Sequence, residues 1–291
     1  MKIGMTLPTM VPGLDRAILL EWMRRIDRGP YATLAAGERL AFPNQEMLVT
    51  LSAAAAVTER VRIACTVVVL PLHATLLVAK QLATLDVLSA GRLTVGVGVG
   101  GREEDYRVAA ASFARRARRL EEQVGVLRRA WRGEQVIEGV APIGPAPCQP
   151  GGPEILAGSL VASSIRRAAR FADGLCGFSF GPDPTEVERA FETARAAWRE
   201  AGRERAPRLV TSCWFALGPG AREQMDAYVR RYMDFAGRDV AASLAALCTT
   251  VSADALRDAV ARIRDLGADE LILVPTTADP SELDRVADVL G

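Results

Sequence analysis

Residues 60–101 read RVRIACTVVVLPLHATLLVAKQLATLDVLSAGRLTVGVGVGG, and this stretch decides the fold class. The β-branched run at 62–69 is typical of a strand that is covered on both faces in a parallel sheet. A helix is expected from about 74 to 88, and a second strand follows at 92–98. A strand, a helix and a strand in this order form a right-handed crossover between parallel neighbours. The stretch therefore predicts an α/β fold.

The same alternation runs along the whole chain. Eight short apolar segments are interpreted as strands, at residues 2–7, 31–36, 62–69, 92–98, 154–157, 174–180, 208–217 and 270–274. Helices are expected at about 14–28, from 44 onward, and at 74–88, 114–131, 161–172, 184–201, 220–247, 252–266 and 280–290. Because no linker divides the chain, residues 1–291 are expected to form a single-domain (β/α)8 TIM barrel. The Pro- and Gly-rich residues 139–153 are expected to be an irregular insertion after the fourth helix.

Composition excludes several classes of protein. The 36 basic and 35 acidic side chains give a net charge of +1, so no basic excess attracts nucleic acid or an anionic membrane. His73 is the one histidine, which rules out a zinc site made of several histidines from one chain. The lysines are Lys2, which opens the first strand, and Lys80, which is expected in the middle of a helix. Covalent catalysis through a lysine Schiff base is therefore not expected.

The pattern of the cysteines and the amino-terminal sequence predict a cytoplasmic protein. There are five cysteines, none of them in a C-x-x-C pair, and three fall in apolar strand-like runs where a reduced thiol acts as a small hydrophobe. The opening MKIGMTLPTM lacks the apolar core of a signal peptide. No run of about 18 apolar residues is present to span a bilayer.

A glycine-rich motif follows the fourth predicted strand, where residues 96–101 read GVGVGG and satisfy G-x-G-x-x-G. One interpretation is a dinucleotide site, although the next helix is expected only a dozen residues later. A second is that the glycines make room inside the barrel. The third, which we favour, is that the backbone at this strand end approaches a flat cofactor that lies over the barrel mouth.

Other candidate residues lie at the carboxyl ends of the strands, where the active site of a barrel is expected. Thr6 ends the first strand. Glu38 follows the second strand and can exchange a proton or bind a cofactor ring, although a solvated acid is the alternative. His73 follows the third strand and is either a structural or a catalytic imidazole. The dipeptide Gly158-Ser159 precedes a helix and is either a phosphate cradle or a plain turn. The acidic residues 103–105 are expected to be mainly surface charges.

Three segments together resemble the bacterial luciferase superfamily, the luciferase-like flavin and deazaflavin oxidoreductases. Residues 60–101 are similar to that family's third strand, its AK…ATLD helix and its fourth strand with GR-x-x-x-GVG-x-G. ILAGSL…IRRAARFADG at 155–174 resembles the fifth strand with its phosphate turn, and LGADELILVP at 266–275 resembles the closing strand. With the opening MKIGMTLP, the resemblance covers nearly the whole chain.

The resemblance implies a barrel that binds coenzyme F420 or FMN at its mouth. It also implies a non-proline cis peptide bond at Thr66-Val67, against the cofactor ring. The implied cofactor contacts, with Thr6 added from its position, are Thr6, Glu38, Thr66, Val67, Val99, Gly100, Gly158 and Ser159. The phosphate is expected at Gly158-Ser159, with a contribution from 177–179, and Arg102 and Arg107 are candidates to contact the phosphate or an anionic tail.

Within the resemblance we favour F420, because an arginine-rich, lysine-poor composition is typical of high-GC actinobacteria that make this deazaflavin. The expected reaction is hydride transfer to or from a small organic substrate, with Glu38, His73 or Arg39 as the group that protonates or polarises it. This chain has Glu38-Arg39 where some deazaflavin relatives have an acid followed by histidine. It has Gly101-Arg102 where many relatives carry glutamate or tryptophan.

Two alternatives remain open at this point. An FMNH2-dependent monooxygenase would use oxygen and a separate cofactor reductase, and a non-catalytic flavin-binding homologue would use neither. Gly101 stands where many relatives carry an acidic residue, so the sequence is also compatible with the non-catalytic homologue. In each case the expected partner is a small molecule, and a homodimer is expected because relatives commonly form one.

Overall fold

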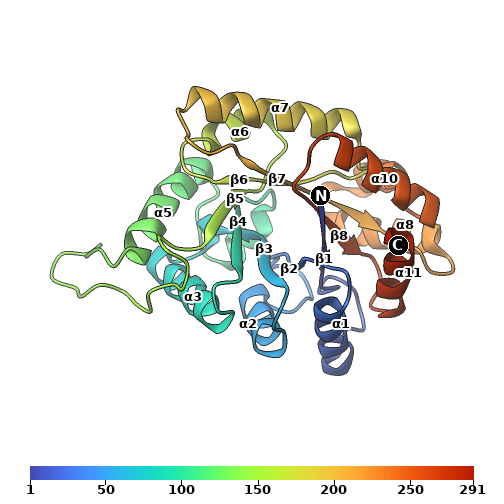
Figure 1. Ribbon diagram of the computed structural model, residues 1–291, viewed down its shortest axis with the longest axis horizontal. Helices are drawn as coiled ribbons and strands as arrows, with labels where there is room; N and C mark the ends of the chain where they lie inside the picture. The colour runs from blue at the N-terminus through green and yellow to red at the C-terminus, as the bar shows by residue number, and fades with distance from the viewer.

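The computed structural model describes residues 1–291, and its strands close into a barrel. Neighbouring strands are parallel throughout, and β8 pairs with β1 to complete the ring (Figure 1). The strands are β1 Lys2–Thr6, β2 Thr33–Ala36, β3 Arg62–Val69, β4 Leu93–Gly98, β5 Glu154–Ala157, β6 Gly174–Phe178, β7 Arg208–Phe215 and β8 Glu270–Pro275. The predicted (β/α)8 barrel is therefore confirmed.

Helices surround the strands on the outside of the ring (Figure 1). They are α1 Arg16–Arg28, α2 Met47–Val57, α3 Thr75–Leu88, α4 Glu103–Val108, α5 Arg116–Trp131, α6 Ala162–Ala168, α7 Pro184–Glu200, α8 Ala221–Tyr232, α9 Arg238–Leu247, α10 Ala253–Asp265 and α11 Ser281–Leu290. Two short 3-10 helices, η1 Leu70–Leu72 and η2 Asp234–Ala236, complete the elements. None of these helices combines the length and the apolar character that crossing a bilayer requires.

The two faces of the strands build two separate cores, because successive residues of a strand point to opposite sides. Outward residues such as Leu34, Ile63 and Val95 join the helices in a cluster of 56 buried residues. The inward cluster has one residue from each of six strands: Ala35, Ala64, Leu156, Cys176, Val210 and Ile272. These side chains fill the middle of the barrel, so the interior is packed and is not a pore.

A network of charged residues, one of them fully buried, closes the amino-terminal end of the barrel. Arg208, the first residue of β7, contacts Glu154 and Glu270, which are the first residues of β5 and β8. Its Nη2 lies 2.5 Å from Oε2 of Glu270. Arg62, the first residue of β3, donates a hydrogen bond to Oγ1 of Thr94 at 2.7 Å. The side chain of Glu270 is only 1% exposed, so its charge depends on the guanidinium of Arg208.

The segment after β4 differs from the prediction. A helix was expected a dozen residues after the glycines, but α4 begins at Glu103. Asp105 and Tyr106 of α4 are buried, although the loop was expected to carry mainly surface charges. The carboxylate of Asp105 accepts hydrogen bonds from the backbone N–H groups of Leu40 and Ala41, at 3.0 and 2.7 Å. Asp105 therefore fixes the loop after β2, which explains its burial.

The helices α8 and α9 pack over the barrel mouth. They belong to a second cluster of 11 buried residues, which includes Met225 and Tyr228 of α8, Trp214 of β7 and Met10 from the loop after β1. Trp214 lies near the carboxyl end of its strand. The two helices, which we call the α8–α9 hairpin, therefore cover one side of the mouth. The sequence predicted helices across 220–247 but did not indicate where they pack.

Residues 139–153 contain no helix or strand, which confirms the predicted irregular insertion. Figure 1 shows this loop projecting from the barrel beside α3 and α5. Nζ of Lys80 donates a hydrogen bond to the carbonyl of Gly144 at 2.8 Å and holds the loop against α3. Cys148 lies in this loop and is exposed, whereas Cys65, Cys176, Cys213 and Cys248 are buried.

We expect Arg208→Met to lower the free energy of unfolding by about 3 kcal/mol, because it leaves the buried Glu270 carboxylate without its counter-charge. Urea denaturation followed by circular dichroism measures this change. The matched control is Arg257→Met, which removes an exposed pair with Asp254 and should cost about 0.5 kcal/mol or less. Equal losses for the two variants would show that the buried network adds nothing.

Candidate active site

The predicted cofactor contacts come together at the carboxyl ends of adjacent strands. In chain order they lie at the end of β1, after β2, near the end of β3, after β4 and after β5: Thr6, Glu38, Thr66, Val67, Val99, Gly100, Gly158 and Ser159. Thr6 is buried, and its Oγ1 has no hydrogen-bond partner. The last six are partly exposed, so a ligand at the mouth can reach them.

A cis peptide bond joins Thr66 to Val67, as the resemblance implied. The register between β3 and β4 shifts between Cys65 and Val68, so Thr66 and Val67 bulge out of the strand ladder. Val67 packs against the inward cluster of the barrel. Its partly exposed side chain therefore forms part of the floor of the mouth.

Glycines surround the side chain of Val67. A Cβ atom added to Gly98 would lie 2.7 Å from Cγ2 of Val67, and one added to Gly158 would lie 2.6 Å from Cγ1. At Gly96 the corresponding distance to Cγ1 is 3.1 Å. The glycines of the motif thus make room inside the barrel, as the second interpretation proposed. The closed barrel excludes the dinucleotide interpretation, which needs an open sheet.

The structure brings Glu38 and His73 together. Oε1 of Glu38 lies 2.8 Å from Nε2 of His73, and Oε2 accepts a hydrogen bond from the backbone N–H of Val69 at 2.6 Å. The side chain of Glu38 is 2% exposed and that of His73 is 19% exposed. Glu38 is therefore a buried, fully engaged carboxylate, which contradicts the solvated-acid alternative.

The contacts of His73 leave one ring nitrogen available. Because a carboxylate only accepts hydrogen bonds, the pair with Glu38 places the imidazole hydrogen on Nε2. Nδ1 has no hydrogen-bond partner in the structure. With Nε2 held in this way, Nδ1 is the atom at which a proton can be accepted from or donated to a ligand.

Gln123 of α5, which was not predicted from the sequence, holds the backbone beside the imidazole. Its Nε2 donates hydrogen bonds to the carbonyl of His73 at 3.1 Å and to Oγ1 of Thr75 at 3.0 Å. Gln123 is buried next to Val124 on the apolar face of α5. A polar residue inside that apolar stripe was the signal that could have indicated its role.

Arg39 does not join the Glu38–His73 pair. It is 6% exposed, and its Nη1 donates a hydrogen bond to the carbonyl of Tyr232 at 3.1 Å, which links the loop after β2 to the end of α8. Its guanidinium lies 4.0 Å from the ring centre of Phe42. The aromatic side chains on this side of the mouth were also not identified as functional from the sequence.

The groups of the turn expected to hold a phosphate are already hydrogen-bonded within the protein. The N–H of Gly158 donates to the carbonyl of Val97 at 2.8 Å, and Oγ of Ser159 accepts from the N–H of Val161 at 3.0 Å. The expected contribution from 177–179 is not supported. The hydroxyl of Ser179 is buried and donates to Oε2 of Glu186 at 2.7 Å, and the side chain of Leu160 covers Gly177.

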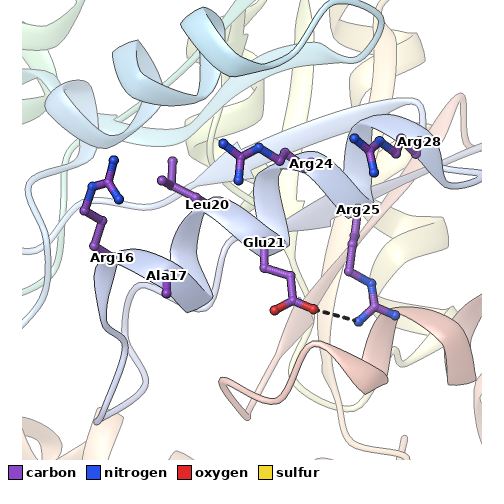
Figure 2. A pocket seen from close by; sticks show the side chains of 7 residues that line it. All are labelled: Arg16, Ala17, Leu20, Glu21, Arg24, Arg25 and Arg28. Atoms are coloured by element: carbon purple, nitrogen blue, oxygen red, sulfur yellow. Dashed lines mark hydrogen bonds and ion pairs between the residues drawn. The ribbon is translucent and has the colours of Figure 1, made fainter.

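An open cavity lies on the outside of the barrel, away from these residues. It measures about 600 Å³ and runs along the outside of α1, where Figure 2 shows Arg16, Arg24 and Arg28 extending from the helix. An ion pair of 3.3 Å joins Glu21 to Arg25 there. This surface has no histidine, so the candidate active site is the mouth, where Glu38 and His73 meet.

The chain belongs to the luciferase-like monooxygenase family, whose pattern matches residues 1–275. This confirms the resemblance seen in the sequence. Members of the family are oxidoreductases, monooxygenases among them. The uncharacterized protein Rv0953c of Mycobacterium tuberculosis (strain ATCC 25618 / H37Rv) is 34% identical over 170 residues. The matched region covers 56% of this chain and 59% of that protein, which is less than two thirds of its length.

Solved structures share the whole fold at lower identity. The monooxygenase RslO1 from Streptomyces bottropensis has a TM-score of 0.81 and 22% identity, over 100% of this chain and 97% of that chain. An F420-dependent secondary alcohol dehydrogenase, in complex with an F420-acetone adduct, has a TM-score of 0.79 and 16% identity, over 99% and 98%. At these identities the similarity shows the fold alone.

We expect Gly98→Ala to destabilise the protein by about 1–3 kcal/mol, because the new Cβ would overlap the side chain of Val67. In a Val67→Ala background the same substitution should cost less, since the overlapping atoms are gone. Urea denaturation of the four proteins in this cycle measures the coupling. Gly101→Ala is the control, because open space surrounds that position. Additive effects of the two substitutions would contradict the proposed contact.

Since His73 is the one imidazole of the chain, its ¹⁵N signals can be assigned without ambiguity. For the neutral ring we expect the hydrogen on Nε2, with a slowly exchanging N–H signal. Glu38→Leu should remove the acceptor and give a mixture of the two tautomers with faster exchange. Glu104→Leu changes an exposed carboxylate and should leave the spectrum as it is. A wild-type ring protonated on Nδ1 would disprove the arrangement.

Proposed function

We propose that this protein is an F420-dependent oxidoreductase that transfers a hydride between the deazaflavin and a small organic substrate. The observation that carries the proposal is the Glu38–His73 pair at the mouth of a luciferase-like barrel. The pair follows β2 and β3, and the bulge at Thr66-Val67 lies on the same rim. Acid–base groups are thus next to a partly exposed apolar floor, which suits a flat ring with a reacting substrate above it.

The residues present fit a deazaflavin. Val67 offers an apolar surface for the ring, and the buried hydroxyl of Thr6 has an unused hydrogen-bonding atom. The hydroxyl of Ser159, at the same rim, can donate a hydrogen bond to a phosphate, whereas the N–H groups of Gly158 and Ser159 already donate to backbone carbonyls. When bound, F420 supplies a hydride as an electron pair.

Side chains of the protein then transfer the proton to or from the substrate. Both oxygens of Glu38 are engaged, by Val69 and by His73, so Glu38 acts by holding the imidazole in place. His73 exchanges the proton with the substrate through Nδ1. Arg39 donates toward α8 and is not placed as the proton donor. The packed α8–α9 hairpin limits the access of water from its side of the mouth.

An FMNH2-dependent monooxygenase is the second candidate function. It is supported by the description of the family as monooxygenases and by the shared fold with RslO1. A non-catalytic flavin-binding protein is the third, because Gly101-Arg102 stands where relatives carry an acid. The engaged Glu38–His73 pair argues against this third candidate, since a binding protein has no need of it. A cytoplasmic homodimer, with a separate reductase in the FMN case, remains part of the proposal.

Titration of the purified protein with F420 and with FMN, followed by fluorescence, tests the cofactor. We expect F420 to bind more tightly than FMN by at least about tenfold in Kd, which corresponds to about 1.4 kcal/mol. Tighter FMN binding would replace the proposal by the monooxygenase, and an aerobic assay with FMNH2 would then show oxygen consumption. Binding of neither cofactor would rule out both enzymes.

A further inference from the structure

Two arginines at the mouth have no carboxylate partner. Arg39 is 6% exposed and forms one side-chain hydrogen bond, to the carbonyl of Tyr232, while its Nε is buried without a partner. Arg102 is partly exposed, donates no side-chain hydrogen bond, and its Nε is also buried without a partner. A buried guanidinium with unused donors is costly unless an acceptor completes it.

The two guanidiniums flank the same aromatic rings. That of Arg39 lies 5.1 Å from the ring centre of Tyr232 and 5.8 Å from that of Phe235. That of Arg102 lies 4.8 and 4.5 Å from the same two centres. Such cation–π contacts contribute about 0.5–2 kcal/mol each, but they leave both charges in place.

Nearby acids do not neutralise this pair. Burial and the neighbouring Arg102 lower the pKa of Arg39, which nevertheless remains charged because arginine titrates far above neutral pH. Two acidic groups, Asp105 and Glu104, act on Arg39 through space and raise its pKa. Asp105 is committed to the backbone of the loop after β2, and Glu104 is exposed to solvent. The mouth therefore holds two adjacent positive charges with no counter-charge in contact.

A purely structural role explains only part of this arrangement. The bond from Arg39 to Tyr232 ties the loop after β2 to α8, and a neutral donor would serve equally well. A structural role for Arg39 does not explain why Arg102 is positioned beside it, because the two positive charges repel each other. An oxyanion that bridges the two would supply both the missing acceptors and the missing negative charge.

We propose that Arg39 and Arg102 bind a carboxylate or phosphate group of the substrate. Arg39 follows Glu38 directly in the chain, so the anion would bind to the same loop after β2 that carries Glu38. The assignment rests on the proposed function, because it takes the mouth as the place of reaction, and it narrows the substrate to an anionic small molecule. The anionic tail of a cofactor is the other source of the same chemistry, and the experiment separates the two.

The first arm uses the cofactor-free protein and inorganic phosphate, at constant ionic strength. We expect phosphate to raise the Tm of the wild type, and Arg102→Gln to weaken phosphate binding at least about tenfold, as measured by calorimetry. Arg39→Gln should do the same, and if it fails to fold, the partly exposed Arg102 carries the test. Arg205→Gln is the matched control, since Arg205 is exposed on the loop before β7, at the opposite end of the barrel. Equal phosphate binding by all variants would overturn the proposal and would place the anion elsewhere, for example at Gly158-Ser159.

The second arm titrates Arg102→Gln with F420. Unchanged F420 affinity is expected and assigns the anion to the substrate. A loss of F420 affinity as large as the loss of phosphate affinity assigns it to the cofactor and overturns the proposal. Because the first arm contains no cofactor, a protein that binds phosphate through Arg102 but neither F420 nor FMN would refute the proposed redox function separately.

Discussion

The arrangement of the barrel mouth depends on the packing of one side chain, Val67, into space that glycines leave free. Gly96 and Gly98 of β4 and Gly158 after β5 all lack the Cβ atom that would meet it. With Val67 turned inward, β3 resumes its ladder at Val68, and the next residue presents its N–H to Glu38. The 3-10 helix that follows then places His73 against the other oxygen of Glu38. Steric contacts and hydrogen bonds thus connect the packing of Val67 inside the barrel to the Glu38–His73 pair on its rim.

The alternation of strands and helices was sufficient to predict the barrel, because period-2 and period-3.6 patterns are local properties of the chain. The candidate site was predicted only in part. Glu38 and His73 were each singled out, but their contact joins residues 35 positions apart and depends on the bulge between them. The burial of Asp105 was missed because its partners are backbone groups, which carry no sequence signal. The α8–α9 hairpin was predicted as helices, but its place over the mouth depends on long-range packing with Met10 and Trp214.

Charge is organised differently at the two ends of the barrel. At the amino-terminal end, Arg208 is shared by two glutamates, so each carboxylate contacts a positive charge. At the carboxyl end, Arg39 and Arg102 are held by aromatic rings without a counter-charge. The first arrangement pairs each charge with an opposite one, whereas the second leaves Nε of both arginines without an acceptor. This contrast agrees with the usual division of a barrel into a stability face and an active face.

The distribution of the cysteines has a practical consequence. Burial raises the pKa of the thiols of Cys176, Cys213 and Cys248 to about 12, and it raises the pKa of Cys65 as well, so these four hold almost no thiolate near neutral pH. Cys148 alone is exposed, on the loop that projects beside α3 and α5. A maleimide dye or spin label would therefore attach at a single surface point without any cysteine having to be replaced first, and its signal would report on the motion of this loop alone.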